Sequence, residues 1–304
     1  MYAYTNNEWD PLKHVFVGNA DNAHWPVNCP VYRKNEETTA WRDTPVPSGP
    51  VDDLIIRQAN TDLWMFEVKL MRHANVWQPK ELDFASFDGM YNYCPRDRIL
   101  IVGDRVIDAP MVYPTRIPEI KALDWAFDNE IIKCNNPLAK FDAANVCRLG
   151  KDLLYLVSSS GNIEGAKWLQ ETLGKDYHVH VLDNIYSGVH IDSTISPVRE
   201  GLVVINKDRV KKVPEVFANW DIIWMGKEDI VDQPFIDYPY ASNYIGLNFL
   251  AVNPETVICD PKQNILIDKL DKYNVKVDAV DLRHSRTLGG GHHCVTLDIV
   301  RDVA

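Results

Sequence analysis

Residues 146–182 contain three patterns in succession: VCRLGKDLLYLV (146–157), NIEGAKWLQETL (162–173) and YHVHVL (177–182). The first has two apolar runs separated by Gly150-Lys151, which is typical of a β-hairpin with a tight turn. The second places apolar residues at helical spacing and is followed by Gly174, where a C-cap glycine belongs. The third alternates like a strand. Together the patterns predict a strand–strand–helix–strand unit.

This unit recurs along the chain. Residues 249–259 (FLAVNPETVIC) predict a second hairpin, and a helical pattern at 263–272 and a strand pattern at 275–282 follow it. Two more hairpins are predicted at 99–107 (ILIVGDRVI) and 198–205 (VREGLVVI). The recurrence of one supersecondary unit indicates an α/β fold built from repeats.

A polar residue stands just before, or at the start of, the first strand of each unit. The five positions are Asp97, Asp142, His190, Ser242 and Cys294, and their successive separations are 45, 48, 52 and 52 residues. In repeats arranged around an axis, equivalent positions converge in space although they are far apart in sequence. We therefore expect one central site. The alternative is coincidence, since polar residues are common at strand ends.

The composition is that of a globular enzyme: 304 residues, 46% apolar and 25% charged, with a formal net charge of −11. Such acidity disfavours nucleic-acid binding because it repels phosphate backbones. No apolar run approaches the roughly 18–20 residues that cross a bilayer, and the first residues resemble neither a signal nor a transit peptide. We expect a cytoplasmic protein without membrane contact, and its six cysteines as free thiols.

No Gly/Ser/Pro-rich linker divides the chain, so we expect one domain over residues 1–304. The polar, proline-rich segment 28–50 is interpreted as an irregular excursion from the first unit.

Cys294 differs from the other cysteines because it follows three glycines in LGGGHHC (288–294). Glycines let the backbone approach a ligand closely, and a thiol beyond such a loop can act as a nucleophile. The alternative is a structural cysteine opening a strand. A metal site with His292 and His293 is disfavoured, because adjacent side chains on a strand point to opposite faces. No metal and no organic cofactor are expected.

The triplet 190–192 (His-Ile-Asp) is expected to lie in a strand, where residues i and i+2 share a face. A histidine beside a carboxylate suits a general acid/base next to a cation-binding group. With Asp97, Asp142 and Cys294, the triplet describes a site for a planar cation that carries an electrophilic carbon. A guanidinium fits, since its N–H groups bind carboxylates in a bidentate manner.

The chain resembles the amidinotransferases, the family of glycine amidinotransferase and the inosamine-phosphate amidinotransferases. The motifs that carry the resemblance are NEWDPL with VFVGNA (7–20), PRD with GDRVIDAPM (95–111), FDAAN with RLGKDLLY (141–155), HID with NKDR (190–209) and LGGGHHC (288–294). They span about residues 6–300. The resemblance implies a five-bladed α/β propeller of ββαβ modules with pseudo-five-fold symmetry, and a possible homodimer.

The same resemblance implies roles for individual residues. Cys294 is expected to be the nucleophile that becomes amidinated, His190 the acid/base and Asp142 its carboxylate partner. Substrate binding is expected of Asp97, Asp192, Arg209 and Ser242, with Arg209 receiving a substrate carboxylate. The implied reaction is a ping-pong transfer of the amidino group of L-arginine to an acceptor amine. Glycine is the expected acceptor, giving guanidinoacetate and ornithine.

Several positions depart from the family pattern, and we expect them to surround the acceptor side of the site. Asn145 replaces an acid, Ala241 a serine, His292 an aromatic residue and Val189 a methionine, and the segment after Met111 is short. Two alternatives to the transferase remain. One is a guanidine hydrolase of the arginine deiminase or dihydrolase type, in which water replaces the amine; the other is a non-catalytic guanidine-binding protein.

Overall fold

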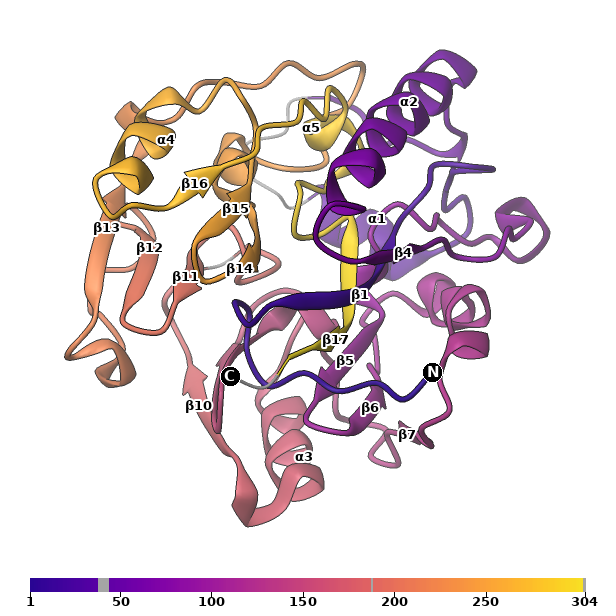
Figure 1. Ribbon diagram of the computed structural model, residues 1–304. Coiled ribbons are helices and arrows are strands. Elements are labelled where there is room, and N and C mark those ends of the chain that lie inside the picture. Colours follow the sequence, from indigo (N-terminus) through magenta and orange to yellow (C-terminus); the bar gives the residue numbers. More distant parts are fainter. Residues whose placement is uncertain (38–43, 187, 303–304) are drawn as a thin grey trace.

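Five three-stranded sheets follow one another around the molecule (Figure 1) in the residues that the structure describes. The structure is a computed structural model that describes residues 1–37, 44–186 and 188–302. In each sheet the first two strands are antiparallel, and the third is parallel to the second. This is the arrangement of a five-bladed α/β propeller.

The unit predicted from residues 146–182 is confirmed. Strands β8 (Val146–Leu149) and β9 (Asp152–Leu156) form a hairpin, helix α3 (Ile163–Leu173) follows, and β10 (His178–Leu182) pairs parallel with β9. Gly150 makes the turn with φ of +87°, a conformation that glycine adopts without a steric penalty. The Asn162 side chain caps α3 by accepting from the Gly165 amide at 2.8 Å.

Three further units follow the same plan, although two of them lack the α-helix. Between β6 and β7, and between β12 and β13, short 3₁₀ turns take its place, and prolines 114, 118 and 214 lie in or beside these turns. The elements are β5 (Ile99–Val102), β6 (Arg105–Asp108) and β7 (Ile131–Lys133); β11 (Ile195–Arg199), β12 (Leu202–Asn206) and β13 (Asp221–Met225); and β14 (Leu250–Asn253), β15 (Thr256–Ile258), α4 (Asn264–Asp271) and β16 (Lys276–Val277).

The two ends of the chain together build the fifth unit. Strand β17 (Thr296–Arg301) pairs antiparallel with β1 (Leu12–Val17), and β1 pairs parallel with β4 (Asn75–Trp77) after helix α2 (Asp53–Leu70). Pairing of the C-terminal with an N-terminal strand closes the ring of blades. The first strands of the five units are therefore β5, β8, β11, β14 and β17, and each follows one of the five polar positions found in the sequence.

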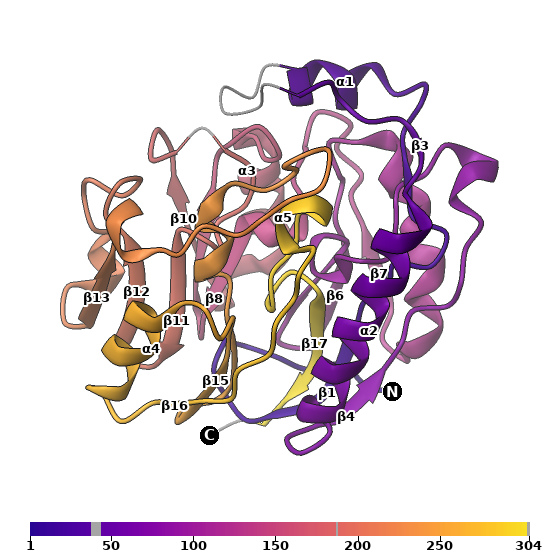
Figure 2. The same ribbon diagram turned by 90° about the horizontal axis from the view of Figure 1, so that it is seen from above.

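The segment 28–50 is more regular than expected, and this part of our interpretation was wrong. It contains α1 (Pro30–Glu37) and β3 (Gly49–Pro50), which pairs with β2 (His24–Trp25). Residues 38–43 of the predicted excursion lie outside the described residues. In Figure 2, α1 lies at one end of the molecule and the termini lie toward the other. Helix α5 (Ser285–Leu288) is short and precedes the glycine run. Among the described residues, no helix combines the length and apolar content that crossing a membrane requires.

A buried ionic cluster lies where β17 meets the axis of the propeller. The Asp298 side chain is fully buried and pairs with Arg148 and Arg301 at 2.7 Å each, and also with Arg96. Burial alone would raise the pKa of Asp298, but the three guanidinium groups outweigh it and hold the pKa well below its usual value. The carboxylate thus links three blades through charge.

Removing this carboxylate should destabilise the protein strongly. We expect Asp298→Ala to lower the free energy of unfolding by about 3–5 kcal/mol, because buried guanidinium groups lose their anion. Urea denaturation measures this. The matched control is Asp302→Ala, which breaks an exposed pair with Lys13 and should change stability by less than about 1 kcal/mol. Equal effects of the two substitutions would contradict the prediction.

Candidate active site

The five polar positions meet in one pocket at the end of the propeller axis. The pocket contains about 780 Å³ of space between atoms, counted out to its open mouth. Its walls include Asp97, Asp142, His190, Asp192, Ser242 and Cys294. The pocket is also lined by hydroxyl-bearing side chains, namely Tyr91, Tyr113, Ser159, Ser160, Tyr186, Ser193 and Tyr240.

Cys294 is held in a turn before β17 by close packing of the glycine run. A Cβ on Gly291 would lie 2.8 Å from the Cβ of Asn248, and one on Gly290 would lie 2.5 Å from the sulfur of Cys94. The Asn248 Oδ1 accepts from the backbone amides of His293 and Cys294, both at 3.0 Å. Only residues without a Cβ allow the loop to pack this closely, so the glycines fix where the thiol stands.

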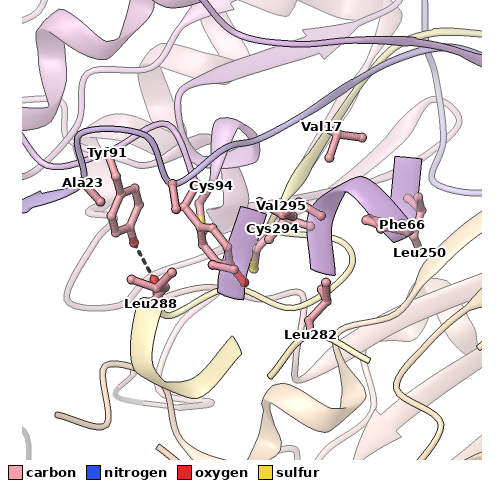
Figure 3. Packing of buried hydrophobic residues seen from close by; sticks show 14 of the residues in the cluster. Val17, Ala23, Phe66, Tyr91, Cys94, Leu250, Leu282, Leu288, Cys294 and Val295 are labelled. Atoms are coloured by element: carbon pink, nitrogen blue, oxygen red, sulfur yellow. Dashed lines mark hydrogen bonds between the residues drawn. The ribbon is translucent and has the colours of Figure 1, made fainter. Parts of the chain in front are cut away.

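The Cys294 thiol lies between an apolar core and a carboxylate. Figure 3 shows it among buried apolar side chains that include Val295, Leu282 and Tyr91. Its sulfur donates to Asp192 Oδ2 at 3.2 Å. Burial and the charge of Asp192 raise the pKa of Cys294 well above its usual value. At neutral pH Cys294 is therefore a thiol, and a bound cation would favour the thiolate.

His190 lies between two carboxylates. Its Nε2 is 3.1 Å from Asp142 Oδ2, and its Nδ1 is 3.5 Å from Asp97 Oδ1. Burial alone would lower the pKa of His190, but Asp97 and Asp142 outweigh it and raise the pKa to about 9. At neutral pH His190 is an imidazolium, which can give a proton to a departing amine.

The prediction that residues 190–192 lie in a strand was wrong. They form a turn before β11, in which the Ile191 amide donates to Ala144 O at 3.1 Å and the Thr194 amide donates to Ile191 O at 2.8 Å. His190 and Asp192 nevertheless both line the pocket. Residues 292–295 are also a turn and not a strand, so alternation does not separate His293 from Cys294. Both side chains contact Asp192.

Asp97 is oriented by an arginine that the sequence did not single out. Its Oδ2 accepts from Arg116 Nη1 at 2.8 Å, and Arg116 also pairs with Glu119 at 3.0 Å. Asp97 Oδ1 is buried and accepts no hydrogen bond from any described residue. Burial raises the pKa of Asp97, and His190 and Arg116 only partly offset it. This oxygen is available to an N–H donor of a ligand.

Ser193 and Ser242 belong to a second wall of the site, and Arg209 lies behind them. The Arg209 guanidinium donates to Ser242 Oγ at 3.0 Å, and to Ser193 and Thr194 at 3.2 and 2.8 Å. The rings of Tyr186 and Tyr244 lie against it. Arg209, which the sequence predicted to bind substrate, therefore does not line the pocket itself but contacts two serines that do. Such a wall suits an anionic group of a ligand.

The departures from the family pattern do not all surround the pocket, which corrects our expectation. Val189 and Ala241 line it. Asn145 is fully buried beneath it and donates to Leu156 O at 2.9 Å and Val189 O at 3.3 Å. His292 faces away from the pocket: its Nε2 donates to Val280 O at 2.7 Å, and its ring meets Phe66. Position 145 therefore supports the wall, and position 292 belongs to the core.

Some pocket residues had no recognisable signal in the sequence. Glu36 on α1 lines the pocket and accepts from Tyr238 at 2.8 Å and Tyr113 at 3.1 Å. Arg116, which also lines the pocket, pairs with Glu119 at i, i+3 spacing in a proline-rich segment, and that spacing alone does not indicate a site. Within the described ranges, no three His, Cys, Asp or Glu side chains are grouped so as to hold a metal ion.

The chain matches no protein-family model. It is 36% identical over 335 residues to inosamine-phosphate amidinotransferase 1 of Streptomyces glaucescens, an alignment that covers 97% of this chain and 96% of the relative. It is 28% identical over 352 residues to the mitochondrial glycine amidinotransferase of Xenopus laevis, covering 97% and 82%.

A solved structure of the same kind of protein as the first relative superimposes closely on this chain. The inosamine-phosphate amidinotransferase of Streptomyces griseus superimposes with a TM-score of 0.90 at 35% identity, covering 99% of this chain and 97% of that one. A dimethylarginine dimethylaminohydrolase, with a TM-score of 0.67 at 16% identity, covers 94% and 99% and shares the fold alone.

Proposed function

Since this chain belongs to the amidinotransferase family, we propose that it transfers the amidino group of L-arginine to an acceptor amine through an amidino-Cys294 intermediate. The observation that carries the proposal is the arrangement around the thiol. Cys294 Sγ is 3.2 Å from the Asp192 carboxylate, and His190 lies between Asp97 and Asp142 in the same pocket. A guanidinium bound by the carboxylates would present its central carbon to the sulfur.

The first half-reaction replaces a C–N bond with a C–S bond. Guanidinium binding beside Asp192 supplies the positive charge that favours the Cys294 thiolate, whose proton leaves to solvent. The sulfur attacks the guanidino carbon, and the bond from that carbon to Nε breaks. His190 gives its proton to this nitrogen, and ornithine departs. The hydrogen bond to Asp142 fixes the imidazole ring, and Nδ1, with its longer contact to Asp97, is the proposed donor.

The second half-reaction reverses the roles. An acceptor amine enters the vacated site and attacks the amidino carbon, while neutral His190 takes a proton from the amine. The C–S bond breaks, and the Cys294 thiolate is regenerated. His190 thus serves both half-reactions, and its contacts with Asp97 and Asp142 hold the ring in place for both proton transfers.

Two observations support an acceptor larger than glycine. The relative with 36% identity is named for an inosamine phosphate, whereas the glycine enzyme is 28% identical. The pocket wall is also rich in hydroxyl groups, which suit the hydrogen-bonding groups of an aminated polyol. Glycine, expected from the sequence, is the competing acceptor. Arg209 with Ser193 and Ser242 is the proposed seat for a carboxylate of arginine or for an anionic group of the acceptor.

Intact-protein mass spectrometry with arginine tests the chemistry, and an ornithine assay with an amine panel tests the acceptor. The panel contains glycine, lysine, 4-aminobutyrate, ethanolamine and an inosamine phosphate. We expect a mass gain of one amidino group and the fastest ornithine release with the inosamine. A strict preference for glycine would overturn the acceptor proposal. Citrulline formation that no amine accelerates would make the protein a hydrolase, and the absence of any adduct would leave a binding protein.

The raised pKa of His190 predicts how activity depends on pH. The value of kcat/KM for arginine reports the free enzyme, in which His190 carries its proton below about pH 9. Because the Cys294 thiol must lose its proton to solvent while His190 keeps its own, we expect kcat/KM to rise roughly tenfold per unit up to about pH 9 and to level off above it. Asp97→Asn should move this break to lower pH, because Asp97 is the largest contributor that raises the pKa of His190. A break that Asp97→Asn leaves in place would assign it to another group.

A further inference from the structure

We infer that His293 and Glu8 form a positioning pair that holds the Asp192 carboxylate, as an anion, beside Cys294. Neither residue has a role in the reaction proposed above. Glu8 belongs to the NEWDPL motif near the start of the chain, and His293 directly precedes the nucleophile. The inference rests on the proposed function where it concerns arginine, and on geometry alone where it concerns Asp192.

His293 bridges two carboxylates. Its Nδ1 is 2.9 Å from Asp192 Oδ2, and its Nε2 is 3.2 Å from Glu8 Oε2. An ionised carboxylate only accepts hydrogen bonds, so the ring N–H groups are the donors of this bridge. His293 therefore ties the Asp192 carboxylate to Glu8.

Glu8 is fixed by the ionic cluster behind it. Its Oε1 accepts from Arg148 Nε at 2.9 Å, its Oε2 accepts from Arg148 Nη2 at 2.7 Å, and Arg96 lies 3.7 Å away. Burial alone would raise the pKa of Glu8, but Arg148 and the hydrogen bond from His293 outweigh it and lower the pKa well below its usual value. The anion that orients His293 is thus rigid and remains charged at working pH.

Asp192 Oδ2 accepts hydrogen bonds from both His293 and the Cys294 thiol, so the position of His293 affects this carboxylate directly. Burial alone would raise the pKa of Asp192. His293 lowers this pKa most, His190 and Cys294 lower it further, and the result is a pKa of about 2. The charged and titratable groups that face this pair are His190 and Cys294 on the pocket side, Cys147 on β8, and Arg96, Arg148 and Asp298 behind Glu8. Without the hydrogen bond from His293, burial would favour a protonated Asp192, which binds a guanidinium poorly.

Two polar substitutions separate the contacts of His293. Asparagine places its amide where Nδ1 stands and can still donate to Asp192, whereas glutamine reaches toward Glu8. We expect His293→Leu and His293→Gln to raise KM for arginine roughly 10- to 100-fold, the range for a lost hydrogen bond to a charged group. His293→Asn should recover much of this loss. The matched control is His292→Phe, at the neighbouring histidine that faces Phe66 and Val280, and it should leave KM unchanged.

The pH profile separates positioning from a merely structural role. Asp192 is an anion above about pH 2 in the wild type, so the limb of kcat/KM for arginine at which Asp192 takes up a proton should move to higher pH in His293→Leu. A structural defect would lower kcat/KM equally at all pH values. Equal KM values in His293→Leu and the wild type, or an unmoved acid limb, would overturn the inference.

A measurement without substrate keeps this test independent of the proposed function. The ¹³C resonance of the Asp192 carboxyl carbon, assigned with Asp192→Asn, should show no titration between pH 4 and 8 in the wild type, following its lowered pKa. It should titrate within that window in His293→Leu. A protein that releases no ornithine would refute the proposed function, while the carboxyl titration would still decide the role of His293. A resonance that behaves identically in both proteins would refute that role.

Discussion

Replacing Cys294 by alanine is expected to abolish the arginine-dependent mass gain and to lower turnover by roughly 10⁴-fold or more, the scale seen when a covalent nucleophile is removed. In the proposed mechanism both half-reactions pass through the sulfur, and Asp192, which lies 3.2 Å from it, is placed to bind a cation. Arginine binding should therefore persist in the variant. Calorimetry on Cys294→Ala with arginine, beside the ornithine assay, measures the two properties separately.

Cys259→Ala is the matched control for this prediction. Cys259 is buried in a different apolar cluster, together with Val257 and Leu266, so its loss should affect stability and leave the adduct unchanged. An adduct that persists in Cys294→Ala would place the covalent chemistry on another nucleophile. Loss of arginine binding together with turnover would mean that the thiol holds the substrate as well as attacking it.

The even spacing of Asp97, Asp142, His190, Ser242 and Cys294 was sufficient to predict that these residues converge on one pocket, because the repeat positions every unit alike. Each residue lies just before the first strand of its unit, and all five first strands begin near the axis. The four predicted hairpins and the helices α3 and α4 were equally predictable, since their signals are local: a glycine turn at Gly150 and a capping residue at Asn162. Helices α1, α2 and α5 were not predicted. Turn and capping signals that repeat at a fixed spacing are therefore enough to predict most of the blades.

Partners brought together by the closure of the ring could not be predicted in this way. Glu8 contacts His293 across nearly the whole length of the chain, and Arg116 meets Asp97 from a segment whose 3₁₀ turns have no strong pattern. The turns at 190–192 and 292–295 were taken as strands because an apolar run follows each of them. Their hydrogen bonds to Ala144 and Asn248 come from other units, so tertiary contacts decide their conformation.

Replacing His190 by asparagine is expected to lower kcat by roughly 10²- to 10⁴-fold, the usual contribution of a general acid/base. The side chain would keep a hydrogen-bonding group but could neither give nor take a proton. The imidazolium contacts with Asp142 at 3.1 Å and Asp97 at 3.5 Å would also be lost. Rapid-quench measurement of ornithine release and of transfer to the amine gives the loss in each half-reaction.

The leaving group distinguishes acid catalysis from other roles of His190. Canavanine releases an aminooxy nitrogen that is far less basic than an alkylamine, so its departure needs little help from an acid. His190→Asn should therefore form the adduct from canavanine at close to the wild-type rate, while arginine remains slow. Transfer from that adduct should recover at high pH, where the acceptor amine is already neutral and needs no base. If canavanine and arginine are slowed equally, the proton that His190 moves is not the one on the departing amine, and the remaining candidate is the proton of the Cys294 thiol.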